Sequence, residues 1–169
     1  MDEVHFQQHG SRCRLWVPPE VKDLVCYHAP TRKSISFVGA VRLGDGKLVM
    51  SRPEAMFDAQ TCWQFLRKLE GIARRTGRKT VVISDNARYH HARLHEDWRS
   101  EVADHFSLYF PPPYSPRLNP IERVWKLIRR RCLHNRYFHD LSDVVRALEP
   151  RLQDWSRPNA TLRRLCAIV

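Results

Sequence analysis

Residues 114–125 read Y-S-P-R-L-N-P-I-E-R-V-W, and this stretch decides the fold together with V-V-I-S-D-N-A-R-Y-H at residues 81–90. An unbroken apolar run from Val81 to Ile83 is typical of a strand buried in a parallel sheet. Asp85 follows the end of this strand, where open α/β sheets place their functional sites. The sequence therefore predicts an α/β protein with an acid at a strand end.

The stretch at 114–125 carries the signals of a helix start. Asn119 suits the N-cap, Pro120 the first helical position and Glu122 the third. On geometry alone, a capping box is the simpler interpretation, with the Glu122 carboxylate turned back to the Asn119 backbone N–H. The alternative is a metal ligand that projects from the first helical turn, beside the strand that carries Asp85. The helix signals alone are compatible with both.

The two motifs together resemble the DDE transposases of the mariner-like superfamily, in its bacterial insertion-sequence branch. Asp85 of D-N-A-R-Y-H and Glu122 of the second motif, with 36 residues between them, match the second and third acids of that family. The family's first acid lies in an Asp-Glu pair that opens the first strand, and here Asp2 and Glu3 precede V-H-F. Neighbouring strand residues point to opposite faces, so only one of the pair can face the site. The resemblance favours Asp2 and leaves Glu3 as its rival.

The resemblance also implies the chemistry. DNA strand cleavage by water needs positive charge beside the attacking and leaving oxygens, which two Mg²⁺ or Mn²⁺ ions about 4 Å apart supply. Such hard cations take carboxylate oxygens, so the expected ligands are Asp2, Asp85 and Glu122. Asn86 and His90 belong to the matched motif and are expected to position DNA or water. For His90, a loop histidine without a catalytic role is an equal alternative.

The charge balance points to a polyanionic partner. The 29 Lys and Arg against 18 Asp and Glu give a net charge of +11, which favours nucleic acid over a membrane surface. Arg123, Lys126 and Arg130 belong to the densest positive run, on the predicted helix that carries Glu122. A phosphate-contacting surface and a merely solvated helix face are both compatible with this run.

Length indicates one domain, residues 1–169, and the cysteine content indicates a cytoplasmic protein; the resemblance implies a bacterial, nucleoid-associated one. Five cysteines, without C-x-x-C spacing, predict reduced thiols. His91 and His95 share a helical face, but the glutamate of the metalloprotease motif is missing, so zinc is not expected. A zinc cluster among the scattered His and Cys residues of the first 28 positions is equally unsupported.

Full-length relatives carry an N-terminal helix-turn-helix region that recognises the element's ends. Asp2 directly follows the first methionine, so the resemblance predicts that this region is absent and is supplied separately or lost. The partners expected are transposon and target DNA, with a second copy of the chain in a homodimer. Two alternatives are an inactive DNA-binding remnant and a cellular ribonuclease-H-like nuclease.

The predicted fold is a ribonuclease-H-like α/β fold. Its mixed sheet has an antiparallel meander followed by parallel strands, with helices on both faces. Strands are expected at Val4–Phe6, Arg14–Val17, Ser34–Leu43, Lys47–Met50, Lys79–Ser84 and Phe106–Phe110. Helices are expected at Ala59–Thr76, Ala92–Val102, Pro120–Leu133, from Leu141 onward and at Thr161–Cys166.

Overall fold

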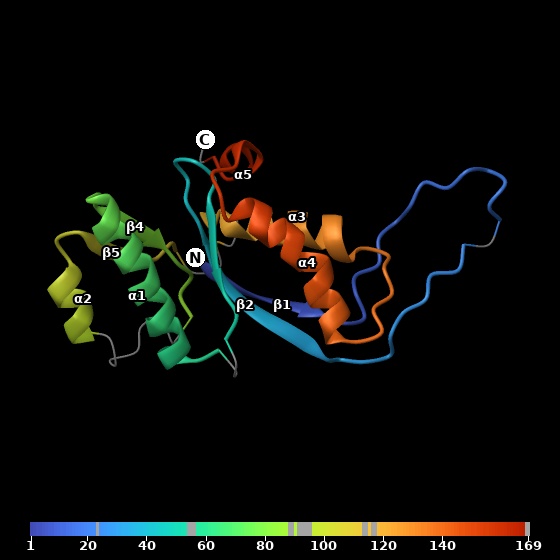
Figure 1. Ribbon diagram of the computed structural model, residues 1–169, viewed down its shortest axis with the longest axis horizontal. Coiled ribbons are helices and arrows are strands. Elements are labelled where there is room, and N and C mark those ends of the chain that lie inside the picture. Colours follow the sequence, from blue (N-terminus) through green and yellow to red (C-terminus); the bar gives the residue numbers. More distant parts are fainter. Residues whose placement is uncertain are drawn as a thin grey trace.

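The computed structural model describes residues 1–22, 24–53, 57–87, 90, 96–112, 115 and 118–167. The strands are β1 (Asp2–Gln7), β2 (Ser34–Val41), β3 (Leu48–Ser51), β4 (Thr80–Ile83) and β5 (Phe106–Tyr109). The helices are α1 (Ala59–Thr76), α2 (Glu96–Val102), α3 (Ile121–Ile128), the π-helical η4 (Arg129–Leu133), α4 (Leu141–Trp155) and α5 (Ala160–Leu165). Figure 1 shows their arrangement.

The strands form two pairing groups that meet at the start of the chain. β1, β2 and β3 are antiparallel neighbours in that order, whereas β4 and β5 are parallel. The Met1 amino group donates to the Ile83 carbonyl at 2.6 Å, so the start of β1 lies beside the end of β4 (Figure 1). The predicted order, an antiparallel meander followed by parallel strands, is confirmed.

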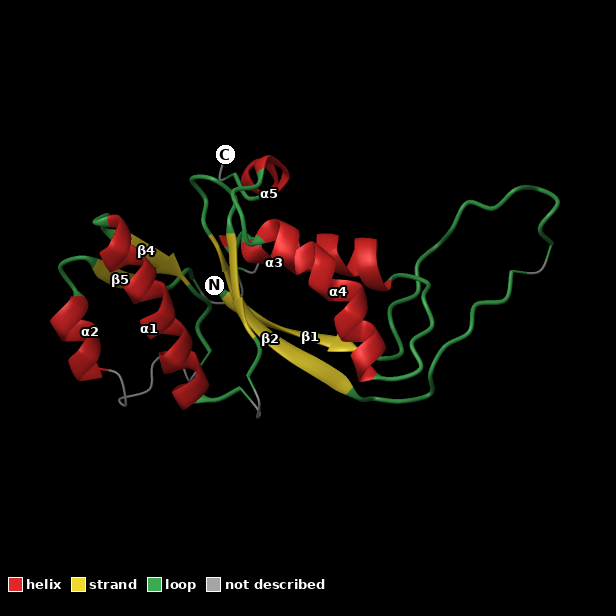
Figure 2. Cartoon of the chain, viewed as in Figure 1, coloured by secondary structure: helices red, strands yellow, loops and turns green. Residues whose placement is uncertain are grey.

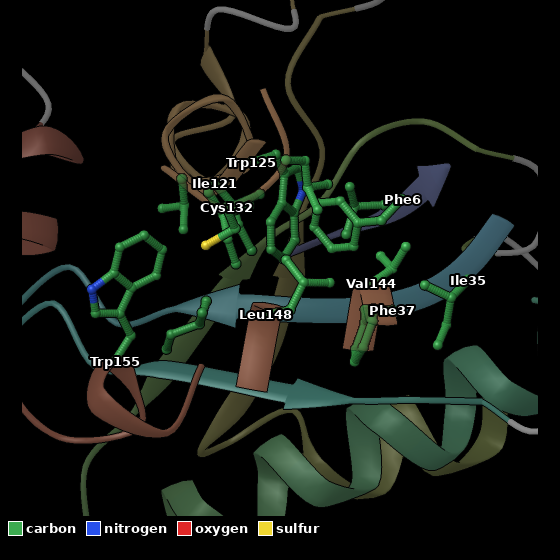
Figure 3. Packing of buried hydrophobic residues seen from close by; sticks show 14 of the residues in the cluster. Phe6, Ile35, Phe37, Ile121, Trp125, Cys132, Val144, Leu148 and Trp155 are labelled. Carbon is green, nitrogen blue, oxygen red and sulfur yellow. The ribbon is translucent and has the colours of Figure 1, made fainter. Parts of the chain in front are cut away.

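Two hydrophobic cores lie on opposite faces of β1 and β2. Val4 and Phe6 of β1 pack with Phe37 of β2 against α3, α4 and α5, and Figure 3 shows the aromatic residues of this core. Val38, the next residue along β2, packs instead with α1 and with β4 and β5. Because adjacent strand residues point to opposite faces, this alternation places helices on both sides of the sheet, as predicted.

Helix α1 has the predicted bounds and is capped at both ends. The Asp58 side chain accepts from the Thr61 N–H at 2.8 Å, and Gly77 ends the helix in the left-handed region at φ 63°. Asp140 is the N-cap of α4, and its side chain accepts from the Asp143 N–H at 3.0 Å. The predicted start of α2 at Ala92 lies outside the described residues, as do His91 and His95.

The predicted strand at Arg14–Val17 is wrong. These residues lie in an irregular excursion between β1 and β2 that extends away from the body (Figures 1 and 2). We call residues 12–33, apart from Asp23, the arm. Its base is fixed where Asn135 exchanges hydrogen bonds with the Cys13 backbone at 2.9 and 3.0 Å. Strand-like composition did not produce a strand here: Arg14–Val17 are exposed and pair with no strand in the described part of the chain, so neither burial nor a partner strand stabilises an extended segment.

The predicted capping of α3 is also wrong. The N-cap is Pro120, without a side-chain hydrogen bond, so the capping box with Glu122 is not formed. Asn119 is buried, and its side-chain amide donates to the Met1 carbonyl at 3.1 Å. The long-range bond to the chain start has replaced the local cap. It joins the helix that carries Glu122 to the strand that carries Asp2.

Candidate active site

Asp2 lies on the face of β1 that α3 covers. Its carboxylate accepts a hydrogen bond from Trp125 Nε1 at 3.1 Å. Gly39 of β2 is its cross-strand partner, and the missing side chain leaves room for the Trp125 ring. Burial, followed by repulsion from Glu122 and Asp85, raises the pKa of Asp2 from 3.8 to about 7. Its carboxyl group is thus held in a crowded, acidic environment.

Asp85 follows β4 and is about half exposed. Its Oδ1 atom accepts from the Ala87 N–H at 3.2 Å and contacts His90 Nε2 at 3.0 Å. The hydrogen bond from His90 lowers the pKa of Asp85, so this carboxylate is ionised at neutral pH. The chain therefore holds one charged oxygen of Asp85 in place and leaves the carboxylate open to solvent.

Glu122 lies in the first turn of α3 and is partly buried. Its charge acts on Asp2 from the helix, while that of Asp85 acts from the end of β4. Three elements that are distant along the sequence thus bring the three carboxyl groups within electrostatic reach of one another. Among the described residues, however, no group of three His, Cys, Asp or Glu side chains stands close enough together to hold a metal ion as it is.

The donor set nevertheless suits Mg²⁺ or Mn²⁺. Catalytic Mg²⁺ is typically bound by one or two carboxylates together with water and substrate phosphate, rather than by a closed cage of protein ligands. The raised pKa of Asp2 arises first from burial and then from the charges of Glu122 and Asp85, and a divalent cation would neutralise this negative charge. Asp2, Asp85 and Glu122 are therefore the side chains that would hold such ions.

Glu3, the rival of Asp2, faces the other side of the sheet. Its charge bears on Cys62 of α1, whose thiol pKa is raised to about 12, chiefly by burial. Glu3 Oε2 is buried without a hydrogen-bond partner within the described residues. The period-two alternation of β1 separates Glu3 from the face on which Asp2 meets α3.

The two remaining motif residues have internal partners. Asn86 donates through its side chain to the Pro111 carbonyl at 2.6 Å, which ties the loop after β4 to the loop after β5. His90 is 1% exposed, so its ring offers almost no surface to DNA. Its ring instead contacts Asp85, Ser84 and Cys62.

The basic run on α3 and η4 divides into two groups. Arg123 donates to the carbonyls of Leu165 and Ala167 at 3.0 and 3.1 Å and so caps the end of α5. Lys126 and Arg130 are exposed. Lys126 lies one turn beyond Glu122, on the same side of α3.

Sequence reasoning missed four residues that support the acids: Gly39, Cys62, Ser84 and Trp125. Cys62 and Trp125 contact their partners only through the tertiary fold, so no spacing rule identifies them, whereas Ser84 lies six residues before His90 in the same motif. Gly39 had a weak signal, because an isolated glycine inside a strand often marks a close approach of another group.

A family model for the DDE superfamily endonucleases matches residues 1–145. The chain belongs to this family. A curated relative, the uncharacterized protein y4pE/y4sA of Sinorhizobium fredii (strain NBRC 101917 / NGR234), is 41% identical over 69 residues, covering 41% of this chain and 47% of that protein.

Similar solved structures confirm the predicted ribonuclease-H-like fold. The Mos1 transposase paired-end complex with left transposon end has a TM-score of 0.71 at 18% identity, covering 98% of this chain and 49% of that one. A pre-cleavage Mos1 transpososome gives 0.72 at 18% identity, covering 98% and 50%. The Mos1 mariner paired end complex with Mn gives 0.68 at 17% identity, with the same coverage. The chain thus spans about half the length of these relatives.

Proposed function

We propose that this chain is the catalytic domain of a DDE transposase that cleaves DNA strands and transfers the freed ends. The observation that carries the proposal is the raised pKa of Asp2, because it arises partly from the charges of Glu122 and Asp85. Such crowding of acids is unfavourable for a metal-free protein and is typical of a functional site. Membership of an endonuclease family supports the same reaction class.

Each acid has a distinct structural role in this proposal. Trp125 holds Asp2 against α3, His90 and Ala87 hold Asp85, and the first turn of α3 presents Glu122. Two Mg²⁺ or Mn²⁺ ions, when bound, would supply the positive charge that phosphodiester cleavage needs. The chain itself fixes the carboxylates before DNA arrives. No side chain is required to act as a nucleophile.

The proposed substrate is DNA, both transposon ends and target. Lys126 lies one turn beyond Glu122 on α3 and Arg130 follows in η4; both are exposed and can contact backbone phosphates. Arg123 is committed to the end of α5, so we assign it a structural role first. Asn86 acts through the loop that it fixes. A homodimer, a separate helix-turn-helix region and association with the nucleoid stay predictions. No helix in the described part of the chain could span a membrane.

The proposal is tested by nicking of supercoiled plasmid DNA in Mn²⁺. Metal ions supply several kcal/mol of transition-state stabilisation, and each 1.36 kcal/mol is tenfold in rate, so Asp85→Asn or Glu122→Gln should slow nicking by roughly a thousandfold. Chelation of the metal should have the same effect. Circular dichroism and DNA binding should change little, because both substitutions conserve shape.

Two controls sharpen this test. Glu149 is exposed on α4, and Glu149→Gln should nick at the wild-type rate. Glu3→Gln should retain most activity, whereas loss of nicking in that variant alone, with Asp2→Asn active, would make Glu3 the first ligand. Undiminished nicking by Asp85→Asn would contradict the assignment and favour a DNA-binding remnant. Activity on RNA–DNA hybrids but not on DNA would instead indicate a cellular nuclease.

A further inference from the structure

His90 is a buried side chain that touches a proposed metal ligand. Its Nε2 atom is 3.0 Å from Asp85 Oδ1 and 2.9 Å from Ser84 Oγ, and its Nδ1 atom is 3.1 Å from Cys62 Sγ. Ser84 and Cys62 are both fully buried. Arg99 of α2 also donates to the His90 carbonyl. The ring is thus held at Nδ1 by Cys62 and at Nε2 by Ser84, and its Nε2 edge lies against the Asp85 carboxylate.

The contact with Asp85 determines which ring nitrogen carries a proton. A carboxylate oxygen can only accept, so Nε2 carries the proton and donates a hydrogen bond that Asp85 Oδ1 and Ser84 Oγ share. Cys62 keeps its proton, because burial raises its thiol pKa to about 12, and the S–H group can donate to Nδ1. The four side chains are then paired consistently: Cys62 of α1 donates to the His90 ring, and the ring donates to Asp85 and Ser84 at the end of β4.

The same contact makes the two carboxylate oxygens of Asp85 different from each other. Oδ1 receives hydrogen bonds from both the Ala87 N–H and His90. Within the described residues, Oδ2 receives no hydrogen bond. A carboxylate held through one oxygen presents the other in a fixed direction, and such outer hydrogen bonds typically orient metal ligands.

We propose that His90 is a positioning residue for Asp85. Together with the Ala87 N–H it fixes Oδ1 and leaves Oδ2 as the oxygen that would bind a divalent ion, while Cys62 and Ser84 fix the ring. This inference rests on the proposed function of Asp85 as a metal ligand. It assigns to His90 a role inside the protein, in place of contact with DNA or no role at all.

Two substitutions of His90 separate this role from simple packing. A glutamine amide reaches about the place of Nε2, and an asparagine amide about the place of Nδ1. His90→Gln can therefore still donate to Asp85, whereas His90→Asn keeps only the side facing Cys62. Both remove the imidazole ring and both introduce a neutral amide, so each serves as the control for the other.

The measurement is Mn²⁺ affinity by titration calorimetry at pH 7.5, with folding checked by circular dichroism and melting temperature. We expect His90→Asn to weaken Mn²⁺ binding by about 10–100-fold and His90→Gln to stay within about threefold of wild type. Equal affinity in wild type and His90→Asn, or equal loss in both variants, would overturn the proposal.

A measurement on the wild-type chain does not depend on whether the variants fold. ¹⁵N NMR of the His90 ring should show a proton on Nε2, and a ring protonated on Nδ1 alone would overturn the proposal. Asp85→Asn separates the two levels of inference. If that variant binds Mn²⁺ as wild type does, the proposed function fails; if only His90→Asn binds normally, the positioning role alone fails.

Discussion

Asp2 has a carboxyl group whose environment opposes its charge. Burial and the two neighbouring carboxylates raise its pKa from 3.8 to about 7, whereas the Trp125 N–H and the nearby Met1 amino group partly offset them. Between these two pH values the unfolded chain is ionised at Asp2 and the folded chain still holds the proton. The metal-free protein therefore loses stability as pH rises from about 4 to 7, and the loss is complete above pH 7.

Removal of the Asp2 charge should reverse this loss. Asp2→Asn keeps an oxygen for Trp125 Nε1, so we expect it to match wild type near pH 4 and to be more stable by about 2–4 kcal/mol at pH 8. Urea unfolding of metal-free protein at both pH values measures the difference. Mn²⁺ should raise the melting temperature of wild type at pH 8 and have little effect on Asp2→Asn.

A matched substitution tests whether the gain belongs to this site. Asp154 is an exposed acid near the end of α4, so Asp154→Asn should change stability by less than about 0.5 kcal/mol at either pH. If Asp2→Asn were no more stable than wild type at pH 8, the three acids would not share one environment in solution.

At the scale of elements, the contact between α3 and β2 sets the position of Asp2. A Cβ atom on Gly39 would lie 2.6 Å from Cη2 and 3.2 Å from Cζ2 of the Trp125 ring. The indole is fully buried in the core that Figure 3 shows, so it has little room to move. The helix can therefore approach the strand, and Trp125 can reach Asp2, only because residue 39 has no side chain.

Gly39→Ala should therefore weaken both fold and site. We expect unfolding free energy to fall by about 1–3 kcal/mol, as for other overpacked cores. Mn²⁺ affinity should fall as well, because a displaced ring no longer holds the Asp2 carboxylate. Gly44→Ala is the control, since no atom lies within 4 Å of a Cβ there. Equal stability of the two variants would contradict the close packing of Trp125 on β2.

At the scale of the whole molecule, a net charge of +11 attracts nucleic acid but does not identify the surface that binds it. Helices on opposite faces of the sheet carry exposed basic residues. Lys126 lies on α3, one turn beyond Glu122, and Arg130 follows in η4, whereas Arg75 and Arg78 lie at and just beyond the end of α1. The first pair thus belongs to the helical segment that carries a proposed catalytic acid, and the second pair does not.

Replacement of both Lys126 and Arg130 by glutamine should weaken DNA binding alike for all sequences. Each phosphate contact contributes about 0.9 to the slope of log affinity against log salt, so the slope should fall by about 1.8. Arg75→Gln with Arg78→Gln removes the same charge from the other face and should leave the slope nearly unchanged. The same fall in both double variants would indicate non-specific attraction instead of a binding surface beside the acids.

The sequence by itself determined the features that depend on local rules. The order of elements and the type of sheet followed from apolar run length, from the alternation in β1 and β2, and from Asp58 and Gly77 as caps. Local rules failed at Arg14–Val17, because a strand also needs a partner strand and a surface to pack against, and this exposed stretch has neither in the described part of the chain. They also failed at Asn119, because the side-chain amide of Asn119 donates to the Met1 carbonyl and does not cap the helix.

Resemblance selected Asp2, Asp85 and Glu122, but only the tertiary structure decided that their charges act on one another. It also decided which residues hold them, since the ring of Trp125, the imidazole of His90 and the bare backbone of Gly39 meet the acids across long stretches of chain. Periodicity and spacing record which side of an element a residue occupies. Contacts between elements depend on how their surfaces fit, which is a property of the packed molecule.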